Sequence, residues 1–427
     1  MISKPLSELC LEVVDCPHST PKWTTEGHLV IRNQNIRNGR LNLNDKSYTD
    51  TENFEARSRR IRLREGDLII TREAPMGEVC IIPADLECCL GQRMVGLRSN
   101  PEAIAPRFLL YALQSPSVKH QISWNEGTGS TVSNMRIPAL KALEIPLPNV
   151  ADQKAIAHIL GTLDDKIELN RKMNETLEEI AKAVFKSWFV DFDPIRAKME
   201  GRPTGLPDDI AALFPDRLVD SEIGEIPEGW EVRSLDEIGS FLNGLALQKF
   251  PASEGQECIP VVKIAQLRKG NTLGDELFAS GIDQKYVIDD GDFIFSWSGS
   301  LLAKYWVGGR GALNQHLFKV EGNKAPLWFV AFWVQIHLAE FRQIAESKAT
   351  TMGHIKREHL SQAKCLVGSD AVIDLAQRTL TPFIKRSILA EKESRTLADL
   401  RDTLLPKLIS GELQVPDAEK FLEEAGV

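Results

Sequence analysis

The sequence predicts an α+β fold with an internal pseudo-two-fold repeat, in which two mixed α/β domains are joined by two long antiparallel helices forming a coiled coil. Segments of the first half recur in order in the second half. Each half begins with short β-rich stretches broken by Gly, Pro and Asn, and each ends on a long helical pattern. We expect a first domain at 1–150, a central helix at 151–200, a connector at 201–225, a second domain at 226–370, and a C-terminal helix and tail at 371–427.

The repeat appears in matched segments of the two halves. Their offset falls from 231 residues between Gly39 and Gly270 to 220 between Leu140 and Leu360, as loop insertions of unequal length would produce. Two large copies do not make a solenoid of short repeats. The clearest pairs are 30–39 (VIRNQNIRNG) with 261–270 (VVKIAQLRKG), 64–70 (REGDLII) with 289–295 (DDGDFIF), and 90–95 (LGQRMV) with 313–318 (LNQHLF).

Composition is that of a soluble globular protein, with 43% hydrophobic and 26% charged residues. No apolar run approaches the roughly 20 residues of a membrane span, and the N-terminus lacks a signal pattern. The seven cysteines include no Cys-x-x-Cys, which argues against a disulfide framework or a zinc site. The adjacent pair Cys88 and Cys89 is better explained as buried strand filling. We expect a cytoplasmic protein with no membrane partner.

The net charge of −9 sits mostly in the connector and the helices, so the two globular regions are close to neutral. Any basic face must be local, and phosphate binding by this chain alone should be modest.

In chain order, Arg60 to Arg64 alternates at the strand period and 67–71 is an apolar strand. Turn residues at 75–77 and 298–300 follow the matched strands. Helices are expected at 104–115 and 326–344.

A long helix is expected from about 151 to 189, after Pro146-Leu147-Pro148, and a second one near the C-terminus. The apolar stripe of each is narrow, so each needs one main partner, and antiparallel pairing of the two is the economical arrangement. The alternative is that each helix lies on its own domain. Asn170 falls on the stripe, where a buried polar residue fixes register. The candidate interface residues are Leu163, Ile167, Leu177, Ile180, Val184, Trp188, Leu397, Leu400, Leu404 and Leu408.

Sequence signatures of an enzyme are missing. There is no Asn/Asp-Pro-Pro-aromatic tetrad of an adenine methyltransferase and no phosphate-binding loop of an ATPase. Glu346-Ser347-Lys348 is a chance match to a nuclease Glu-x-Lys, because no Pro-Asp precedes it. The histidines lack metal-ligand spacing, so we expect no catalytic residue, metal or cofactor in this chain.

Two similar but unequal halves suit a target with two unequal halves, and duplex DNA is the obvious candidate. The basic run Arg57, Arg59, Arg60, Arg62 and Arg64 would place guanidinium groups along one strand edge to contact phosphates; a solvated strand face explains it equally well.

Base readout is expected at a few polar residues near strand ends. Arg72 follows the apolar strand in a turn that could enter a groove. Gln92 and Arg93 carry the chemistry that reads adenine and guanine, and Gln315 and His316 stand at the matching positions. The alternative is that these residues only cap turns.

A third candidate segment, matched in the second half, is rich in small residues that allow close backbone approach to a phosphate. Trp297 and Trp306 suit base stacking, although a Trp in such a domain is usually core. The candidates of this segment are Gly127, Thr128, Gly129, Ser130, Asn134 and Arg136, with Lys348, Thr350, Thr351, His354 and Lys356 in the second half.

Three strings resemble the specificity (S) subunit of type I restriction–modification enzymes: 185–194 (FKSWFVDFDP), 224–230 (GEIPEGW) and 404–413 (LLPKLISGEL). The resemblance implies two target-recognition domains, each reading one half of a bipartite, asymmetric double-stranded DNA site. It also implies docking of two adenine-methyltransferase (M) subunits and of restriction/translocase (R) subunits. S-adenosylmethionine, ATP and Mg²⁺ would be bound by those partners.

The implied helices would act as a ruler. Half-sites about one turn, ~34 Å, apart fit helices of roughly 39 residues, which span about 58 Å. The rival interpretations are a self-contained methylase or nuclease, which the missing signatures disfavour, and a coiled-coil scaffold for a methyltransferase that reads no DNA. Two large and differing globular domains argue against the scaffold.

Overall fold

Two long helices are the main elements of the computed structural model, which describes residues 2–124, 134–253, 255–274, 277–347 and 353–424. They are α6 (Val150–Phe189) and α13 (Asp370–Ser410), of 40 and 41 residues. Asn149 caps α6, because its Oδ1 accepts a hydrogen bond from the amide of Asp152 at 2.9 Å. The predicted helix at 151–189 is confirmed.

The chain forms two units, one of residues 1–167 with 396–427 and one of residues 168–395. Each long helix therefore contributes to both units. The two units repeat one topology, as the sequence predicts, and each is described by itself below.

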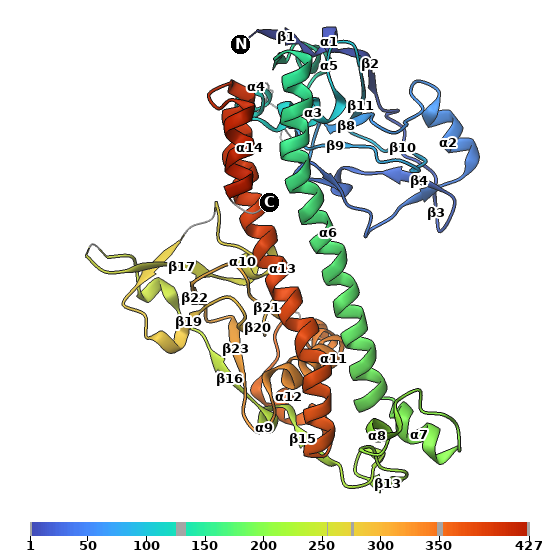
Figure 1. Ribbon diagram of the computed structural model, residues 1–427, viewed down its shortest axis with the longest axis vertical. Helices are drawn as coiled ribbons and strands as arrows, with labels where there is room; N and C mark the ends of the chain where they lie inside the picture. Colours follow the sequence, from blue (N-terminus) through green and yellow to red (C-terminus); the bar gives the residue numbers. More distant parts are fainter. Residues whose placement is uncertain (1, 125–133, 254, 275–276, 348–352, 425–427) are drawn as a thin grey trace. The chain divides into compact units, whose positions relative to one another are not determined.

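Unit 1 contains two four-stranded sheets and two small two-stranded ones (Figure 1). One four-stranded sheet is antiparallel, and the other contains the parallel pair β4 and β10. The antiparallel sheet has the order β2 (Cys10–Asp15), β11 (Met94–Ser99), β8 (Leu68–Thr71), β9 (Val79–Ile81). The other has the order β10 (Cys88–Leu90), β4 (His28–Ile31), β7 (Tyr48–Thr49), β3 (Trp23–Thr24). The small pairs are β1 (Ser3–Pro5) with β12 (Glu144–Pro146) and β5 (Ile36–Arg37) with β6 (Arg40–Leu41).

Unit 2 repeats this plan. Its parallel pair, β17 with β22, corresponds to β4 with β10 in unit 1. The fourth strand of this sheet differs, because β19 pairs with β22, whereas in unit 1 β3 pairs with β7 and β10 is an edge strand. The antiparallel sheet has the order β16 (Gly239–Asn243), β23 (Leu317–Gly322), β20 (Phe293–Ser296), β21 (Ala303–Tyr305). The other has the order β18 (Phe278–Ser280), β17 (Cys258–Val262), β22 (Gly311–Leu313), β19 (Val287–Ile288). The pairs are β15 (Glu231–Ser234) with β24 (Lys364–Val367) and β13 (Leu218–Ser221) with β14 (Gly224–Pro227).

Several, but not all, of the shorter helices also correspond between the two units. The predicted helix at 104–115 is α3, and Pro116 begins a separate α4; in unit 2 one helix, α11, covers the matching stretch. Unit 1 has α1 (Leu6–Leu9), α2 (Thr51–Ser58), α3 (Pro106–Gln114), α4 (Pro116–Trp124), α5 (Ile137–Lys141) and α14 (Val415–Glu424). Unit 2 has α7 (Asp193–Met199), α8 (Asp208–Ala211), α9 (Leu235–Ile238), α10 (Ile264–Lys269), α11 (Leu327–Ser347) and α12 (Arg357–Gln362). Three short 3-10 turns lie at Asn33–Asn35, Leu247–Lys249 and Gln284–Tyr286.

The prediction of a strand at Arg60 to Arg64 is wrong, because this segment belongs to no sheet in the part of the chain that the structure describes. Ile61 and Leu63 are buried and the arginines beside them are exposed, so the alternation is real. The segment nevertheless pairs with no strand of the described sheets. Alternating burial needs only an extended chain lying on a core, and it does not require a ladder partner.

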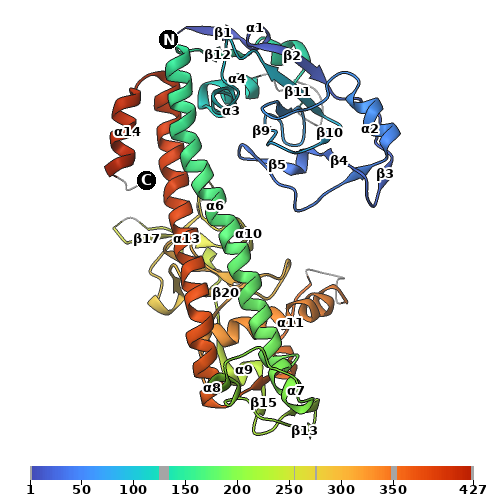
Figure 2. The same cartoon turned by 45° about the vertical axis from the view of Figure 1, so that its right-hand side comes forward.

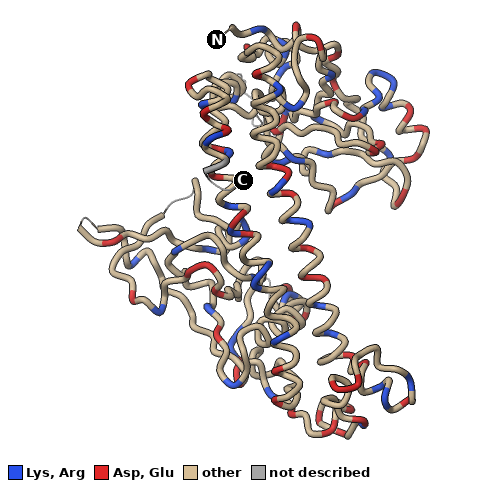
Figure 3. Tube along the Cα trace, in the orientation of Figure 1, with Lys and Arg blue, Asp and Glu red and all other residues tan. Residues whose placement is uncertain are grey.

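Within unit 2 the long helices pair antiparallel. Asn170 donates to the Glu393 carboxylate at 2.9 Å and Asn174 donates to the Ser387 carbonyl at 3.2 Å, so partner numbers fall as α6 advances (Figures 1 and 2). Asn170 is buried, as its place on the stripe predicts. Lysines, arginines and acids are interspersed along both helices (Figure 3).

The apolar stripe is packed against both the partner helix and the globular part, so the two expected arrangements coexist. Ile180 is 43% exposed, and Ala181 takes the inward place beside it, contrary to the predicted stripe. Leu177 lines a cavity of unit 2, and Val184 and Leu400 are partly buried against the cores. The other stripe residues are buried: Leu163, Ile167, Leu397, Leu404 and Leu408 in unit 1 and Trp188 in unit 2.

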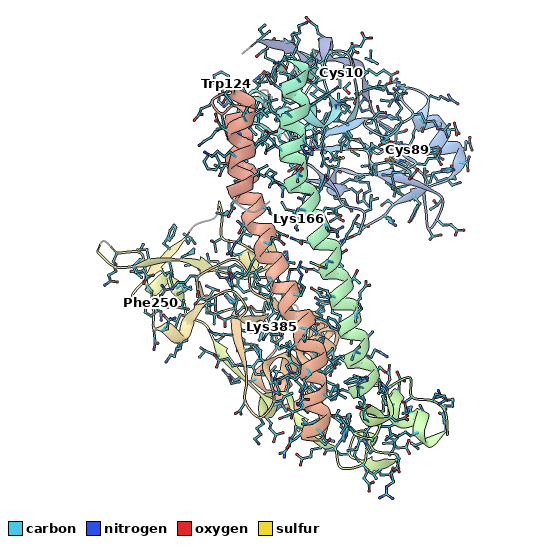
Figure 4. All side chains as sticks on the ribbon, viewed as in Figure 1. Cys10, Cys89, Trp124, Lys166, Phe250 and Lys385 are labelled. Atoms are coloured by element: carbon cyan, nitrogen blue, oxygen red, sulfur yellow. The ribbon has the colours of Figure 1, made fainter. Side chains whose placement is uncertain are left out.

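All seven cysteines are free thiols. Cys88 and Cys89 fill β10 and are buried, as expected, and Figure 4 labels Cys89 within its sheet. Burial raises the pKa of the Cys89 thiol to about 11.

Candidate nucleic-acid interface

Three segments that the sequence analysis marked separately meet in each unit through the same backbone hydrogen bonds. In unit 1 the amide of Arg72 donates to the carbonyl of Arg93 (2.8 Å), and the amide of Met135 donates to the carbonyl of Arg72 (3.1 Å). In unit 2 the amide of Trp297 donates to the carbonyl of His316 (3.3 Å), and the amide of Ile355 donates to the carbonyl of Trp297 (3.0 Å). We call this arrangement the hub.

A fourth segment joins each hub at the end of the first strand of the antiparallel sheet. The amide of Cys16 donates to the Met94 carbonyl, and the amide of Gly244 donates to the Leu317 carbonyl, both at 3.0 Å. Asp15 and Asn243 are therefore equivalent positions, each one residue before its donor. Neither residue was among the predicted site residues, because no matched string of the sequence marks them.

In unit 1 an arginine occupies the centre of the hub. The Arg72 guanidinium donates to both oxygens of Asp15 at 2.9 Å, to the Met135 carbonyl at 2.9 Å and to Asn134 Oδ1 at 3.2 Å. Its side chain is only 12% exposed. Arg72 therefore orients the neighbouring segments. Its entry into a DNA groove stays a prediction, and it would require these hydrogen bonds to be exchanged for contacts with DNA.

In unit 2 a tryptophan occupies the same place. The indole N–H of Trp297 donates to Asn243 Oδ1 at 2.9 Å and to the Gln315 carbonyl at 3.1 Å. The rings of His316 and His354 lie 5.8 and 6.3 Å from the Trp297 ring. The backbone frame is thus kept, while the Arg–Asp pair of unit 1 becomes a Trp–Asn pair.

The dipeptides beside the hubs differ in what they present to solvent. Gln92 is engaged inside unit 1, where its amide donates to the His18 carbonyl at 2.7 Å. Arg93 has a left-handed backbone (φ 65°), and its side chain, 56% exposed, forms a 3.2 Å ion pair with Glu73. In unit 2, His316 Nδ1 lies 2.9 Å from Ser298 Oγ, and Gln315 lies beside its other ring nitrogen.

The basic run does not follow a strand edge, which corrects the expectation. Arg57 is on α2 and buried, donating to the carbonyls of Leu90, Ser19 and Pro17 at 2.8, 2.9 and 3.2 Å. Burial lowers the pKa of Arg57. Its guanidinium is used within the fold, because it satisfies three backbone acceptors.

The remaining arginines of the run are exposed. Arg62 pairs with Glu87 at 2.9 Å and with Glu55 at 3.5 Å. Arg59, Arg60 and Arg64 stand on the same surface segment.

Part of the third candidate segment lies outside the described residues, namely Gly127, Thr128, Gly129, Ser130, Lys348, Thr350 and Thr351. Its described members flank the hubs. Asn134 accepts a hydrogen bond from Arg72, and His354 forms an isolated antiparallel backbone β-bridge with Ser298. Arg136 and Lys356 are exposed. Trp306 is core, as its alternative predicts.

One exposed aromatic residue was missed by the sequence analysis. Trp124, at the C-terminal end of α4, is 80% exposed and has the His120 ring 5.5 Å away (Figure 4). Its signal in the sequence was a Trp directly before the Gly-rich candidate segment.

Within the described ranges no cluster of His, Cys, Asp or Glu is suited to hold a metal ion. A search of the same residues found no helix with the length and apolarity of a membrane span.

Comparisons with known proteins agree with this architecture. The family model described as type I restriction modification DNA specificity domain matches residues 15–179 and 227–365, more than half of the chain. The MjaIX type I restriction enzyme specificity subunit of Methanocaldococcus jannaschii is 26% identical, over 94% of this chain and 88% of the relative. The HindI specificity subunit of Haemophilus influenzae is 23% identical, over 82% and 87%.

A solved structure shares the fold. The S subunit of a type I restriction–modification system from M. genitalium superposes with a TM-score of 0.57 at 18% identity, covering 95% of each chain. Because the family model accounts for both units, this chain belongs to the type I restriction–modification DNA specificity family.

Proposed function

We propose that this chain is the non-catalytic DNA-reading subunit of a type I restriction–modification complex. Each unit reads one half of a bipartite, asymmetric site through the surface around its hub. The observation that carries the proposal is the repeated hub backbone with exchanged side chains, Arg72 and Asp15 against Trp297 and Asn243. Two related domains that recognise different base sequences require a common backbone arrangement with different polar side chains.

Arg93 is the first residue that we assign to base contact. Its exposed guanidinium has the fork geometry that pairs with guanine O6 and N7 in the major groove. DNA must compete with Glu73 for it, which disfavours binding where no guanine compensates. His316 and Gln315 take the equivalent task in unit 2, and Arg136 and Lys356 are assigned to phosphates.

The chemistry belongs to partner subunits in this proposal. Two adenine methyltransferases bind S-adenosylmethionine, and restriction/translocase subunits bind ATP and Mg²⁺, all in the cytoplasm. The names of the relatives, which are specificity subunits of restriction enzymes, support this division. Exposed apolar side chains on the helix pair of unit 2 suit a docking surface for a methyltransferase: Leu169, Ile180 and Leu389.

The test is co-expression of the chain with its neighbouring adenine methyltransferase in methylation-free cells, followed by genome-wide mapping of N6-methyladenine. A gapped two-part motif that appears only when both proteins are present is the expected result. Methylation by the chain alone would reveal a catalytic centre in it. Methylation that ignores its presence would favour the coiled-coil scaffold and overturn the proposal.

A further inference from the structure

The globular part of each unit (3–146 in unit 1 and 231–367 in unit 2) contacts its own stretch of the long helices in two chemically different ways. The first contact is apolar. In unit 1 Phe108 and Leu109 of α3 belong to the same buried apolar cluster as Leu160 of α6. In unit 2 Phe185 of α6 packs against Phe329 and Phe332. Apolar packing is strong but non-directional, so it fixes a position better than an angle.

The second contact in unit 1 is polar. A more exposed part of it joins Arg107 of α3 to Asp165 of α6 at 2.6 Å, and the less exposed part converges on one carboxylate. Asp164 of α6 accepts hydrogen bonds from Arg40 of β6 (2.9 Å), from the Tyr111 hydroxyl of α3 (2.8 Å) and from Arg401 of α13 (2.6 Å). Its side chain is 19% exposed. Two elements of the globular part and both long helices therefore share a single group.

The second contact in unit 2 includes a longer ion pair of Lys304 with Glu391 of α13 at 3.5 Å. Its less exposed part also converges on one carboxylate, but with the opposite placement of charge. Asp290 belongs to the globular part, between β19 and β20, and is 14% exposed. It forms 3.2 Å contacts with both Lys392 and Arg395 of α13, and it accepts from the Gly309 amide at 2.7 Å. Arg395 also donates to the Val307 carbonyl.

The two contacts are not copies of one inherited feature. In unit 1 the carboxylate is on a long helix and a cation is on the globular part, whereas in unit 2 the carboxylate is on the globular part and the cations are on the helix. Unrelated residues have been arranged to make the same link, which indicates that the link itself has a role.

We propose that Asp164 and Asp290 are positioning residues, each at the centre of a polar strut that fixes the angle of a globular part on its own helix segment. Charge-assisted hydrogen bonds are directional, so they can hold an angle that apolar packing leaves free. The inference rests on the proposed function: with the angle held, methylation is confined to a single spacer length between half-sites. The struts set spacer fidelity and do not read bases.

The experiment maps N6-methyladenine in cells that co-express the methyltransferase with wild-type chain, Asp164→Asn or Asp290→Asn. Matched controls are Asp399→Asn on α13 in unit 1 and Asp289→Asn in unit 2, which remove the same charge from exposed residues. We expect each strut variant to methylate sites with a spacer one base pair longer or shorter about tenfold more than wild type, or about 1.4 kcal/mol. The half-site letters should stay unchanged, and both controls should keep the wild-type spacer.

Two further variants cover a failure of Asp164→Asn to fold. Arg40→Ala removes the globular end of the strut and leaves the helix pair intact, so it should broaden the spacer, and Arg40→Lys should restore it. A single native spacer in the folded strut variants, or relaxed half-site letters in them, overturns the inference. If the wild-type chain itself yields no gapped motif, the proposed function fails, and the two failures are thereby distinguished.

Discussion

At the residue scale, the hubs separate residues that orient from residues that can reach DNA. Arg72 has its donors engaged inside unit 1, whereas Arg93 is more than half exposed. The sequence could mark both as candidates, because each is a polar residue at a strand end. The sequence could not show which of the two is free to contact DNA, because Asp15, the carboxylate that pairs with Arg72, is 57 residues away in the chain.

Arg93→Ala should relax one letter of the first half-site, because a bidentate arginine–guanine contact discriminates by about 1–3 kcal/mol. The motif is read from the methylation map, with Arg202→Ala, an exposed connector arginine, as the control. An unchanged motif would place Arg93 outside the readout.

Arg72→Ala should lower the free energy of unfolding by about 1.5–3 kcal/mol, because it leaves a partly buried carboxylate without its charged partner. Asp15→Asn should cost less, since an amide acceptor serves the equivalent position of unit 2 at Asn243. Denaturant unfolding of both variants measures this. Equal losses would contradict this, because they would show that the charge of Asp15, and not its acceptor oxygen, carries the stabilisation.

The strut carboxylates give a pH dependence of known sign. Burial raises the pKa of Asp164, but the charge of Arg401 and the hydrogen bonds from Arg401, Arg40 and Tyr111 outweigh it, so the net pKa lies below the ordinary 3.8. The stabilisation is therefore complete above pH 3.8 and is lost as the pH falls through the lowered value. The difference in unfolding free energy between wild type and Asp164→Asn should be constant near neutrality and shrink in acid. A difference that shrinks instead toward alkaline pH would contradict this.

At the element scale, local patterns predicted most of the fold. The long helices were expected from apolar residues three and four apart, and the boundaries of α6 agree to within one residue. The stretch from Arg60 to Arg64 shows what such patterns cannot predict. Its alternation of apolar and polar residues reflects alternating burial and not pairing with another strand. The two polar struts had no local signal, since Arg40 and Asp164 are 124 residues apart.

Helix length gives a prediction at this scale. Removing one heptad from both helices, 167–173 and 387–393, takes out the hydrogen-bonded pair Asn170 and Glu393 together. It also removes Lys392, one of the two α13 partners of Asp290, while Arg395 remains. The spacer of the methylated motif should change while both half-sites keep their letters. A change in the bases recognised in either half-site would contradict the interpretation of the helices as a ruler.

At the scale of the whole molecule, the doubling predicted from matched strings is confirmed by the repeated topology and by the family match to both units. The family membership disfavours the scaffold interpretation. Which polar residues contact bases stays a prediction, because base contacts depend on how DNA lies on each unit and not on any period in the sequence.

The most direct test of the central claim, one unit for one half-site, compares Arg93→Ala with His316→Ala in a single set of methylation maps. We expect Arg93→Ala to relax a letter in one half of the motif and His316→Ala to relax a letter in the other half. Relaxation in the same half by both variants, or in neither half, would contradict it.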